Sequence, residues 1–368
     1  MRRPRLYPSE KRPLQDPETA AHILQLTNWR GHSNHLYFTT TSYLPGGREI
    51  VFASDRDNRQ NLFKVDIESG EIVQLTDATR ELSGLAACAS PVRREVYFFD
   101  DRELKAADAD KFEETTIYRV PNDRVPSILT PSPDGRFLAF AERTDLGWEI
   151  GPQYQGFEEM LAESPPTTIR VVEIATGKNW AAYEDPAWCS HVNFSPARPD
   201  LICYCHEGPW QQVKQRMWIV TADGSQRYAL RPQDERDAVG HEYWLGDGEH
   251  VAFHNWHREK GHLMGWIRYD NTGLVELPFP EGSSHFQSNS DNSVQVGDGR
   301  ADHPYILLWR IAGGVGKPRK LVRHQSSFHI QRAHPHPIFS PDNKWVLYTS
   351  DATGYCNVYL AKAEEAGP

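Results

Sequence analysis

Short runs in which apolar and polar residues alternate recur along the chain, and each follows a turn rich in Ser, Pro, Asp or Gly. Alternation with a period of two is typical of a strand that is buried on one face. Seven copies of this turn-and-strand unit occur, and they begin at Leu44, Ala89, Pro131, Phe194, Leu245, Asn289 and Phe339. Their spacing of roughly 40 to 65 residues fits four short antiparallel strands per repeat. The pattern therefore predicts an all-β fold, a seven-bladed β-propeller.

The N-terminal phrase DPETAAHILQLT, which begins at Asp16, looks like a fourth strand without a blade before it. We expect residues 22–26 to form the outer strand of the last blade, which closes the ring and leaves no free sheet edge. Residues 1–368 are thus predicted to form one domain, with an N-terminal extension over residues 1–15. An insertion between blades over residues 141–166 contains the phrase GFEEMLAE, which predicts a short helix. This insertion is either a lid over one end of the channel or a plain surface loop.

Composition adds constraints on partners and compartment. The formal net charge is -10, whereas a nucleic-acid binder needs a basic surface, so we expect no nucleic-acid partner. No apolar stretch follows the basic first residues, which predicts neither a secretory signal nor a membrane span and favours a cytoplasmic protein. The five cysteines show no CxxC spacing, which favours buried, reduced thiols over a disulfide framework.

Four consecutive repeats carry a histidine at the same place, six residues before the Asp position of the turn. These histidines are His191, His241, His285 and His336. Because equivalent positions of a repeat occupy equivalent places in a propeller, we expect the four side chains to lie side by side at one end of the central channel. Such a convergence is the strongest functional signal in the sequence.

A second histidine, His334, lies two residues before His336. A period of two places both side chains on one face of a strand, where they would bind one ion together. Gln331 is an odd number of residues away from both histidines, so on a regular strand its side chain would point to the opposite face. It would bind the same ion only if the chain bends before the strand, which Pro335 permits. Imidazoles suit Mn, Fe, Zn, Ni or Cu, so the ion's identity stays open at this point. The alternative is that His334 and His336 bind no ion and only pack or hydrogen-bond at the rim of the channel.

The phrase CHEGPWQQVKQRMW contains further candidates, namely His206, Glu207 and Arg216. A histidine and a carboxylate at the end of a strand, followed by an arginine that opens the next strand, would present a charged pair to the same channel mouth. A surface salt bridge is the alternative interpretation.

At these residues the sequence resembles the oligogalacturonate lyases, a propeller family of polysaccharide lyases that act in pectin degradation. The resemblance covers most of the chain, and it is sharpest in CHEGPWQQVKQRMW, GHEYW, SHFQSN and QRAHPHPIFSPDNKWVLYTSD. It implies a divalent metal, most often Mn²⁺, and a short acidic oligosaccharide as substrate. Carried over residue by residue, it implies the metal ligands His285, Gln331, His334 and His336, with His241 as catalytic base and Arg216 as substrate arginine.

The chemistry of a 4-linked uronide accounts for such residues. The hydrogen at C5 is poorly acidic beside an anionic carboxylate, and a metal on that carboxylate would stabilise the intermediate. A neutral His241 would take the proton, Arg216 would pair with substrate carboxylate, and His206 or His191 would orient the substrate or protonate the leaving oxygen.

The sequence departs from the family's pattern in two places. Gln155 and Gly156 stand where more basic character is expected, and Ile330 stands where an arginine would precede the metal glutamine. Arg332 is a candidate substitute, so we include it with Glu207 among the substrate-binding residues. An epimerase or isomerase of uronic acids would use the same metal and base, and a propeller that only binds a protein is the third alternative.

Overall fold

The computed structural model describes residues 4–80, 82–311 and 314–363. The chain forms two compact units: unit 1 combines Met1–Thr116 with Ser283–Pro368, and unit 2 is Ile117–Gly282. Among the described residues the strands form seven antiparallel sheets of four or five strands each. The all-β, seven-bladed propeller expected from the repeats is therefore confirmed. The organisation of residues 1–368 as one domain stays a prediction.

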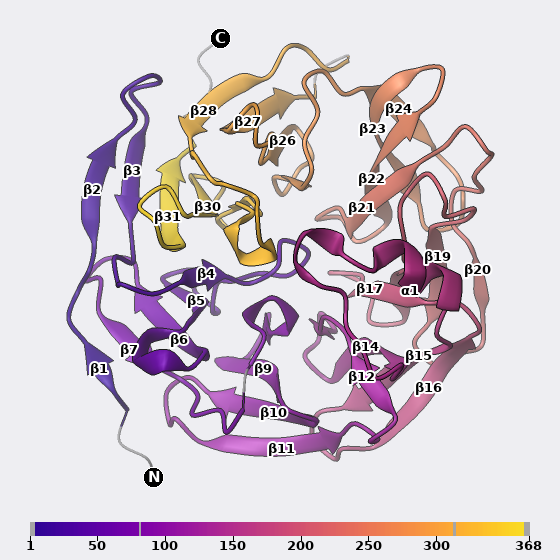
Figure 1. Ribbon diagram of the computed structural model, residues 1–368, viewed down its shortest axis with the longest axis horizontal. Helices are drawn as coiled ribbons and strands as arrows, with labels where there is room; N and C mark the ends of the chain where they lie inside the picture. The colour runs from indigo at the N-terminus through magenta and orange to yellow at the C-terminus, as the bar shows by residue number, and fades with distance from the viewer. Residues whose placement is uncertain (1–3, 81, 312–313, 364–368) are drawn as a thin grey trace. The chain divides into compact units, whose positions relative to one another are not determined.

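Unit 1 contains four of the blades (Figure 1). The first blade consists of β1 (Leu6–Tyr7), β4 (Ser33–His35), β5 (Glu49–Ser54), β6 (Asn61–Asp66) and β7 (Ile72–Gln74). The second consists of β8 (Cys88–Ala89), β9 (Glu95–Asp100), β10 (Glu103–Asp108) and β11 (Glu114–Arg119). The sixth consists of β25 (Phe286–Ser288), β26 (Val294–Gly297), β27 (Tyr305–Arg310) and β28 (Arg319–Arg323). The seventh consists of β2 (Arg12–Gln15), β3 (His22–Gln25), β29 (Ile338–Phe339), β30 (Trp345–Ser350) and β31 (Asn357–Lys362).

The seventh blade is completed by the N-terminal segment, as the sequence predicts. Strand β3 pairs with β31 in the register Ile23 with Ala361 and Leu24 with Leu360. Ile23 and Ala361 are buried in one apolar cluster with Val346 of β30. The structure adds a strand that the pattern did not reveal, because β2 pairs with the outer side of β3 and becomes the fifth strand of this blade (Figure 1).

Unit 2 contains the other three blades. The third consists of β12 (Arg124–Pro126), β13 (Thr130–Pro131), β14 (Phe137–Thr144), β15 (Thr167–Glu173) and β16 (Asn179–Asp185). The fourth consists of β17 (Cys189–Phe194), β18 (Leu201–His206), β19 (Met217–Thr221) and β20 (Arg227–Ala229). The fifth consists of β21 (Val239–Trp244), β22 (His250–His257), β23 (Gly261–Arg268) and β24 (Val275–Pro278).

The recurring turn is held by a small set of side-chain hydrogen bonds. In the last blade the Ser340 hydroxyl donates to Asp342 over 2.6 Å and accepts the backbone N–H of Trp345 over 2.9 Å. Ser132 donates to Asp134 in the same way in the third blade. A serine and an aspartate at this spacing close the turn locally, which explains why the repeat is visible in the sequence.

The insertion forms the expected helix, α1 (Phe157–Glu163). The Phe157 ring lies 5.3 Å from the Trp188 ring, and the Gln212 amide donates to Glu158 over 3.1 Å. These contacts attach the helix to the fourth blade. Its role as a lid stays a prediction.

The cysteines have the state that the sequence predicts. All five cysteines are buried, free thiols. Burial raises the pKa of Cys88, Cys189, Cys203 and Cys205, which keeps these thiols protonated and unreactive. No helix in the described ranges is long and apolar enough to cross a membrane.

Candidate functional site

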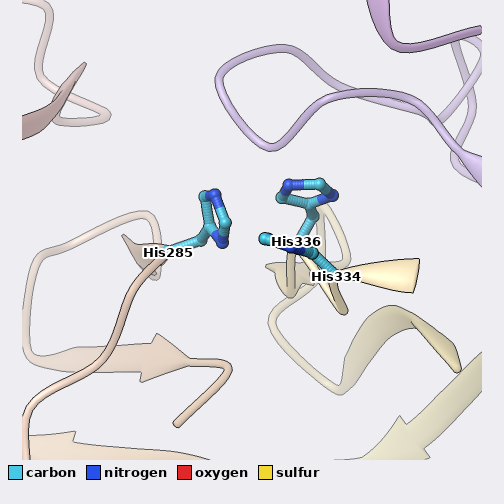
Figure 2. Close-up of side chains that lie close together, drawn as sticks. All are labelled: His285, His334 and His336. Carbon is cyan, nitrogen blue, oxygen red and sulfur yellow. The ribbon is translucent and has the colours of Figure 1, made fainter. Parts of the chain in front are cut away.

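Three histidine side chains of unit 1 lie close together (Figure 2). His285 comes from the segment before β25, whereas His334 and His336 come from the segment before β29. One imidazole nitrogen of each lies within 4.8 Å of the others, and all three residues are buried. The rings of His285 and His336 are 4.2 Å apart, so these two repeat-equivalent residues lie side by side as predicted.

The route by which His334 and His336 meet differs from our expectation, because neither residue lies on a strand. Strand β29 begins only at Ile338. His336 has a φ of 47°, which is the left-handed region and incompatible with strand alternation. The shared face predicted from a period of two is therefore wrong, and it is the local bend that turns both rings toward His285.

The chain bends before His334, as it must if Gln331 is to reach the same site as the histidines. Gln331–Ala333 form a 3-10 turn, η4, immediately before His334. The Gln331 residue is exposed, and its role as a metal ligand stays a prediction.

Two of the three rings are oriented by an oxygen acceptor on one nitrogen. The Nδ1–H of His285 donates to Asp298 Oδ2 over 2.6 Å, which leaves Nε2 directed at the cluster. The Nε2–H of His334 donates to the carbonyl of Phe328 over 3.1 Å. This is the arrangement by which proteins fix the tautomer of a metal-binding histidine.

The other nitrogen of His334 provides a test of whether the site fits a metal ion. Nδ1 of His334 is buried and has no hydrogen-bond partner. An unsatisfied buried acceptor costs about 1–3 kcal/mol, and a cation that accepts its lone pair removes that cost. A buried set of three imidazoles, two of them with fixed tautomers, fits a divalent transition metal.

The backbone between the two C-terminal histidines is held from two sides. The carbonyl of Pro335 accepts the Nε2–H of His35 over 3.0 Å and the backbone N–H of Thr349 over 3.0 Å. Burial lowers the pKa of His35 to about 4, so this imidazole is neutral at ordinary pH. These bonds fix the loop that carries His334 and His336.

Aromatic rings of the first blade pack against the same histidines. The Tyr37 ring lies 5.1 Å from His336, and the Phe38 ring lies 5.3 Å from His285. Both aromatic residues are buried. They restrict rotation of the imidazoles and exclude water from one side of the cluster.

The repeat-equivalent histidines of unit 2 occupy the same unusual backbone conformation. His191 has a φ of 45° and His241 a φ of 47°. The strand register shifts between Ser190 and Asn193, and again between Gly240 and Tyr243, so a bulge accompanies each histidine. Bulges re-aim side chains and are common beside active sites.

His241 lies in an array of rings. The His191 ring is stacked on it at 6.2 Å, the Trp210 ring lies 5.1 Å away, and the His254 ring lies 5.3 Å away. The side-by-side placement predicted for His191 and His241 is therefore confirmed. Sequence reasoning missed Trp210 and treated His254 as structural. His254 lies opposite Gly240 across the pair β21 and β22, a register that the sequence alone does not display.

Arg216 is fully buried beneath these histidines and bound by two carboxylates. Its Nε donates to Glu242 over 2.8 Å and its Nη1 to Glu207 over 3.1 Å, while Nη2 lies 3.3 Å from His191 Nδ1. The predicted pair of Glu207 and Arg216 is thus present, but it is a buried ion pair and not a surface one. Glu242 was not singled out from the sequence.

These contacts control the ionisation of both carboxylates. Burial alone would raise the pKa of Glu207, but the charges of Arg216 and His191 and the hydrogen bonds from Ser190 and Gly208 together outweigh burial and lower the pKa to about 2. Burial would likewise raise the pKa of Glu242, but Arg216 and His191 together hold that pKa well below its usual range. Both groups are therefore ionised carboxylates at neutral pH.

His206 belongs to a separate polar cluster. Its Nε2–H donates to Asp185 over 3.0 Å, and the same carboxylate accepts from Tyr204 over 2.8 Å and from Arg227 over 2.8 Å. Although Asp185, Cys189 and His206 lie close enough for a metal, this carboxylate already has three donors. The substrate-binding role of His206 stays a prediction.

Comparison with known proteins identifies the relatives of this chain. The family model for oligogalacturonate lyase matches residues 6–367. The curated oligogalacturonate lyase of Dickeya dadantii (strain 3937) is 26% identical over 379 residues, which cover 96% of each chain. The curated oligogalacturonide lyase of Pectobacterium atrosepticum is also 26% identical, with 96% of each chain covered.

Solved structures agree with the sequence relatives. An oligogalacturonate lyase in complex with manganese superposes with a TM-score of 0.92 at 25% identity, over 100% of this chain and 99% of the other. The crystal structure of an oligogalacturonate lyase from Vibrio parahaemolyticus gives 0.91 at 26% identity, over 98% and 99% of the two chains. The chain therefore belongs to the oligogalacturonate lyase family, whose members are polysaccharide lyases.

Proposed function

We propose that this protein is a metal-dependent lyase that cleaves short 4-linked oligogalacturonides by β-elimination. The family match over nearly the whole chain supports the reaction class and the substrate. The observation that carries the metal dependence is the buried cluster of three histidines, two of which have their rings oriented by an oxygen acceptor. We expect the protein to act on this substrate in the cytoplasm, and the cytoplasmic localisation stays a prediction.

The residues that would hold the metal are His285, His334 and His336, with Gln331 as a fourth ligand. A manganese complex of a 25% identical relative favours Mn²⁺ as the ion. When bound, the ion supplies Lewis-acid chemistry that offsets the charge of a substrate carboxylate.

His241 is the proposed base. Its imidazole takes the C5 proton, the C5–H electron pair becomes the C4–C5 double bond, and the C4–O bond breaks. The leaving oxygen is protonated, and no water is consumed. A positioned general base contributes roughly 10² to 10⁴ in rate. The bulged backbone and the Trp210 ring, which together restrict the His241 ring, support this assignment.

The remaining candidates are assigned to the substrate. Arg216 orders a substrate carboxylate, and its two carboxylate partners fix the direction in which the guanidinium points. Glu207 holds Arg216, while His191 and His206 orient the sugar or protonate the leaving oxygen. Arg332 supplies a further positive charge near the metal ligands.

Metal content of purified protein tests the proposal independently of the substrate. We expect stoichiometric divalent metal in the wild-type chain and its loss in His334→Ala/His336→Ala, together with loss of uronide cleavage. His329→Ala removes an exposed imidazole from the same segment and is the matched control, which should retain metal and activity. Wild-type protein that binds no divalent metal after loading would contradict the proposal.

A further inference from the structure

Unit 1 contains a polar pocket of about 850 Å³ beside the turn that precedes the metal-ligand candidates. We call it the arginine pocket, and its lining includes Trp29, Arg59, Arg80, Arg332 and Tyr355. Its volume lies within the range of about 300–1,000 Å³ typical of ligand sites.

The pocket is locally basic in an acidic protein. Four arginines and only two aspartates line it, although the whole chain carries a net charge of -10. The two aspartates already have partners: Asp57 accepts from Arg5 over 3.3 Å, and Asp55 accepts from Arg332 over 3.4 Å. The pocket therefore presents net positive charge to an incoming ligand.

Arg59 and Arg80 contribute two of these positive charges, and neither is held by a buried carboxylate of the described chain. The Arg59 guanidinium donates to the carbonyl of Ala78 over 3.0 Å, and no carboxylate lies within 4.0 Å of it among the residues that the structure describes. Arg80 contacts Asp101 at 3.3 Å, but both side chains are largely exposed, so this pair is weak. Arginines with this freedom suit a carboxylate ligand, which they bind through paired N–H groups.

Two exposed aromatic side chains face the same pocket. Trp29 and Tyr355 are each 42% exposed, which is unusual for large aromatic residues. The Tyr355 ring packs edge-on against His32 at 5.6 Å, which holds it in place. Exposed rings offer a flat apolar surface for the C–H face of a sugar, while the arginines bind its acidic group.

One residue connects the pocket to the candidate metal ligands along the sequence. Arg332 lies in η4 directly after Gln331 and two residues before His334, and its side chain lines the pocket. A substrate chain that extends from the metal ligands along η4 would meet Arg332 and the pocket that it lines.

We propose that the arginine pocket is a further uronate subsite, which binds a sugar acid of the same chain away from the scissile bond. This inference rests on the proposed function and adds to it a preference for the chain length of the substrate. The subsite makes affinity grow with chain length, so a tetragalacturonide binds more tightly than a digalacturonide.

Calorimetric titration of metal-loaded protein in a His241→Ala background tests the subsite without turnover. We expect Arg59→Ala/Arg80→Ala to raise the Kd for tetragalacturonide about tenfold, and the Kd for digalacturonide less than about twofold, because two exposed ion pairs are lost only with the longer ligand. Trp29→Ala should also weaken only the longer ligand. Arg300→Ala removes an exposed arginine of another blade and is the control, with no change for either ligand.

Equal Kd values for tetragalacturonide in the background protein, the double arginine variant and Trp29→Ala would overturn the subsite. An equal loss for both ligands would overturn it as well. Turnover in the His241→Ala background would contradict the base and not the pocket, and KM values for the two substrates would then replace Kd. No binding of tetragalacturonide by the background protein would overturn both proposals.

Discussion

His285 and Asp298 form a buried hydrogen-bonded pair in which the imidazole Nδ1 lies 2.6 Å from the carboxylate Oδ2. The other oxygen of Asp298 accepts the backbone N–H of His285 over 2.9 Å and the hydroxyl of Ser283 over 2.9 Å. One carboxylate thus fixes both the ring and the backbone of a candidate metal ligand.

Replacement of this carboxylate should weaken the metal site without removing a ligand. We expect Asp298→Asn to lower metal affinity about 10- to 100-fold, because partners of this kind orient the ligating imidazole. Competition with a metal-binding dye measures the affinity. Asp302→Asn, at an exposed aspartate of the same blade, should bind metal like the wild type. Wild-type affinity in Asp298→Asn would contradict the role given to this pair.

The buried ion pairs of Arg216 predict a large effect on stability. Arg216→Met leaves Glu207 and Glu242 as uncompensated buried carboxylates, so the free energy of unfolding should fall by about 3–5 kcal/mol. Urea unfolding followed by fluorescence measures it. Arg236→Met removes an exposed arginine of the same unit and should change stability little. A loss as small as that of the control would show that the guanidinium does not balance these carboxylates.

Stability should also depend on acid through Glu207. Its pKa is about 2 in the folded chain, against an ordinary value of 4.5. A group whose pKa is depressed on folding stabilises the protein fully above its unfolded pKa and loses that contribution as pH falls through the folded pKa. We therefore expect the free energy of unfolding to decrease between pH 4.5 and about pH 2, less steeply in Glu207→Gln. Identical slopes for the two proteins would contradict this origin.

Removal of the N-terminal strands should destabilise the last blade. Deletion of residues 1–28 removes β2 and β3 and leaves the edge of β31 and its apolar cluster open to water. The thermal midpoint of unfolding should fall by several degrees, as expected for a loss of a few kcal/mol. Among the described strands, deletion of residues 1–9 removes only β1 of the first blade, which the longer deletion also removes, so the difference between the two variants isolates the effect of β2 and β3. An unchanged midpoint in the longer deletion would mean that β3 does not complete the blade.

The blades and the histidine positions were predictable because both are set by local sequence. The Ser and Asp residues of the turn bond within a few residues of each other, so every copy carries its own signal. The adjacency of His285 to His336, and of His191 to His241, follows from their equivalent places in the repeat.

The hydrogen-bond partners of the site residues were not predictable in the same way when they lie on other strands. Asp298 and Glu242 reach His285 and Arg216 through contacts that depend on register, bulges and burial, which a single sequence does not display. The prediction of a strand at His334 was wrong for a related reason. The positive φ of His336 is a local feature of the backbone, and the alternation of residue types does not reveal it.

The central claim is that this protein removes a C5 proton with His241 and breaks the C4–O bond of a galacturonide at a metal centre. The most direct test follows the ultraviolet absorbance of unsaturated uronate during turnover of short galacturonides by manganese-loaded protein. We predict that absorbance rises with substrate consumption, and that His241→Ala, with its metal retained, is slower by roughly 10² to 10⁴. Consumption of substrate without unsaturated product, or near-normal turnover in His241→Ala, would contradict the account.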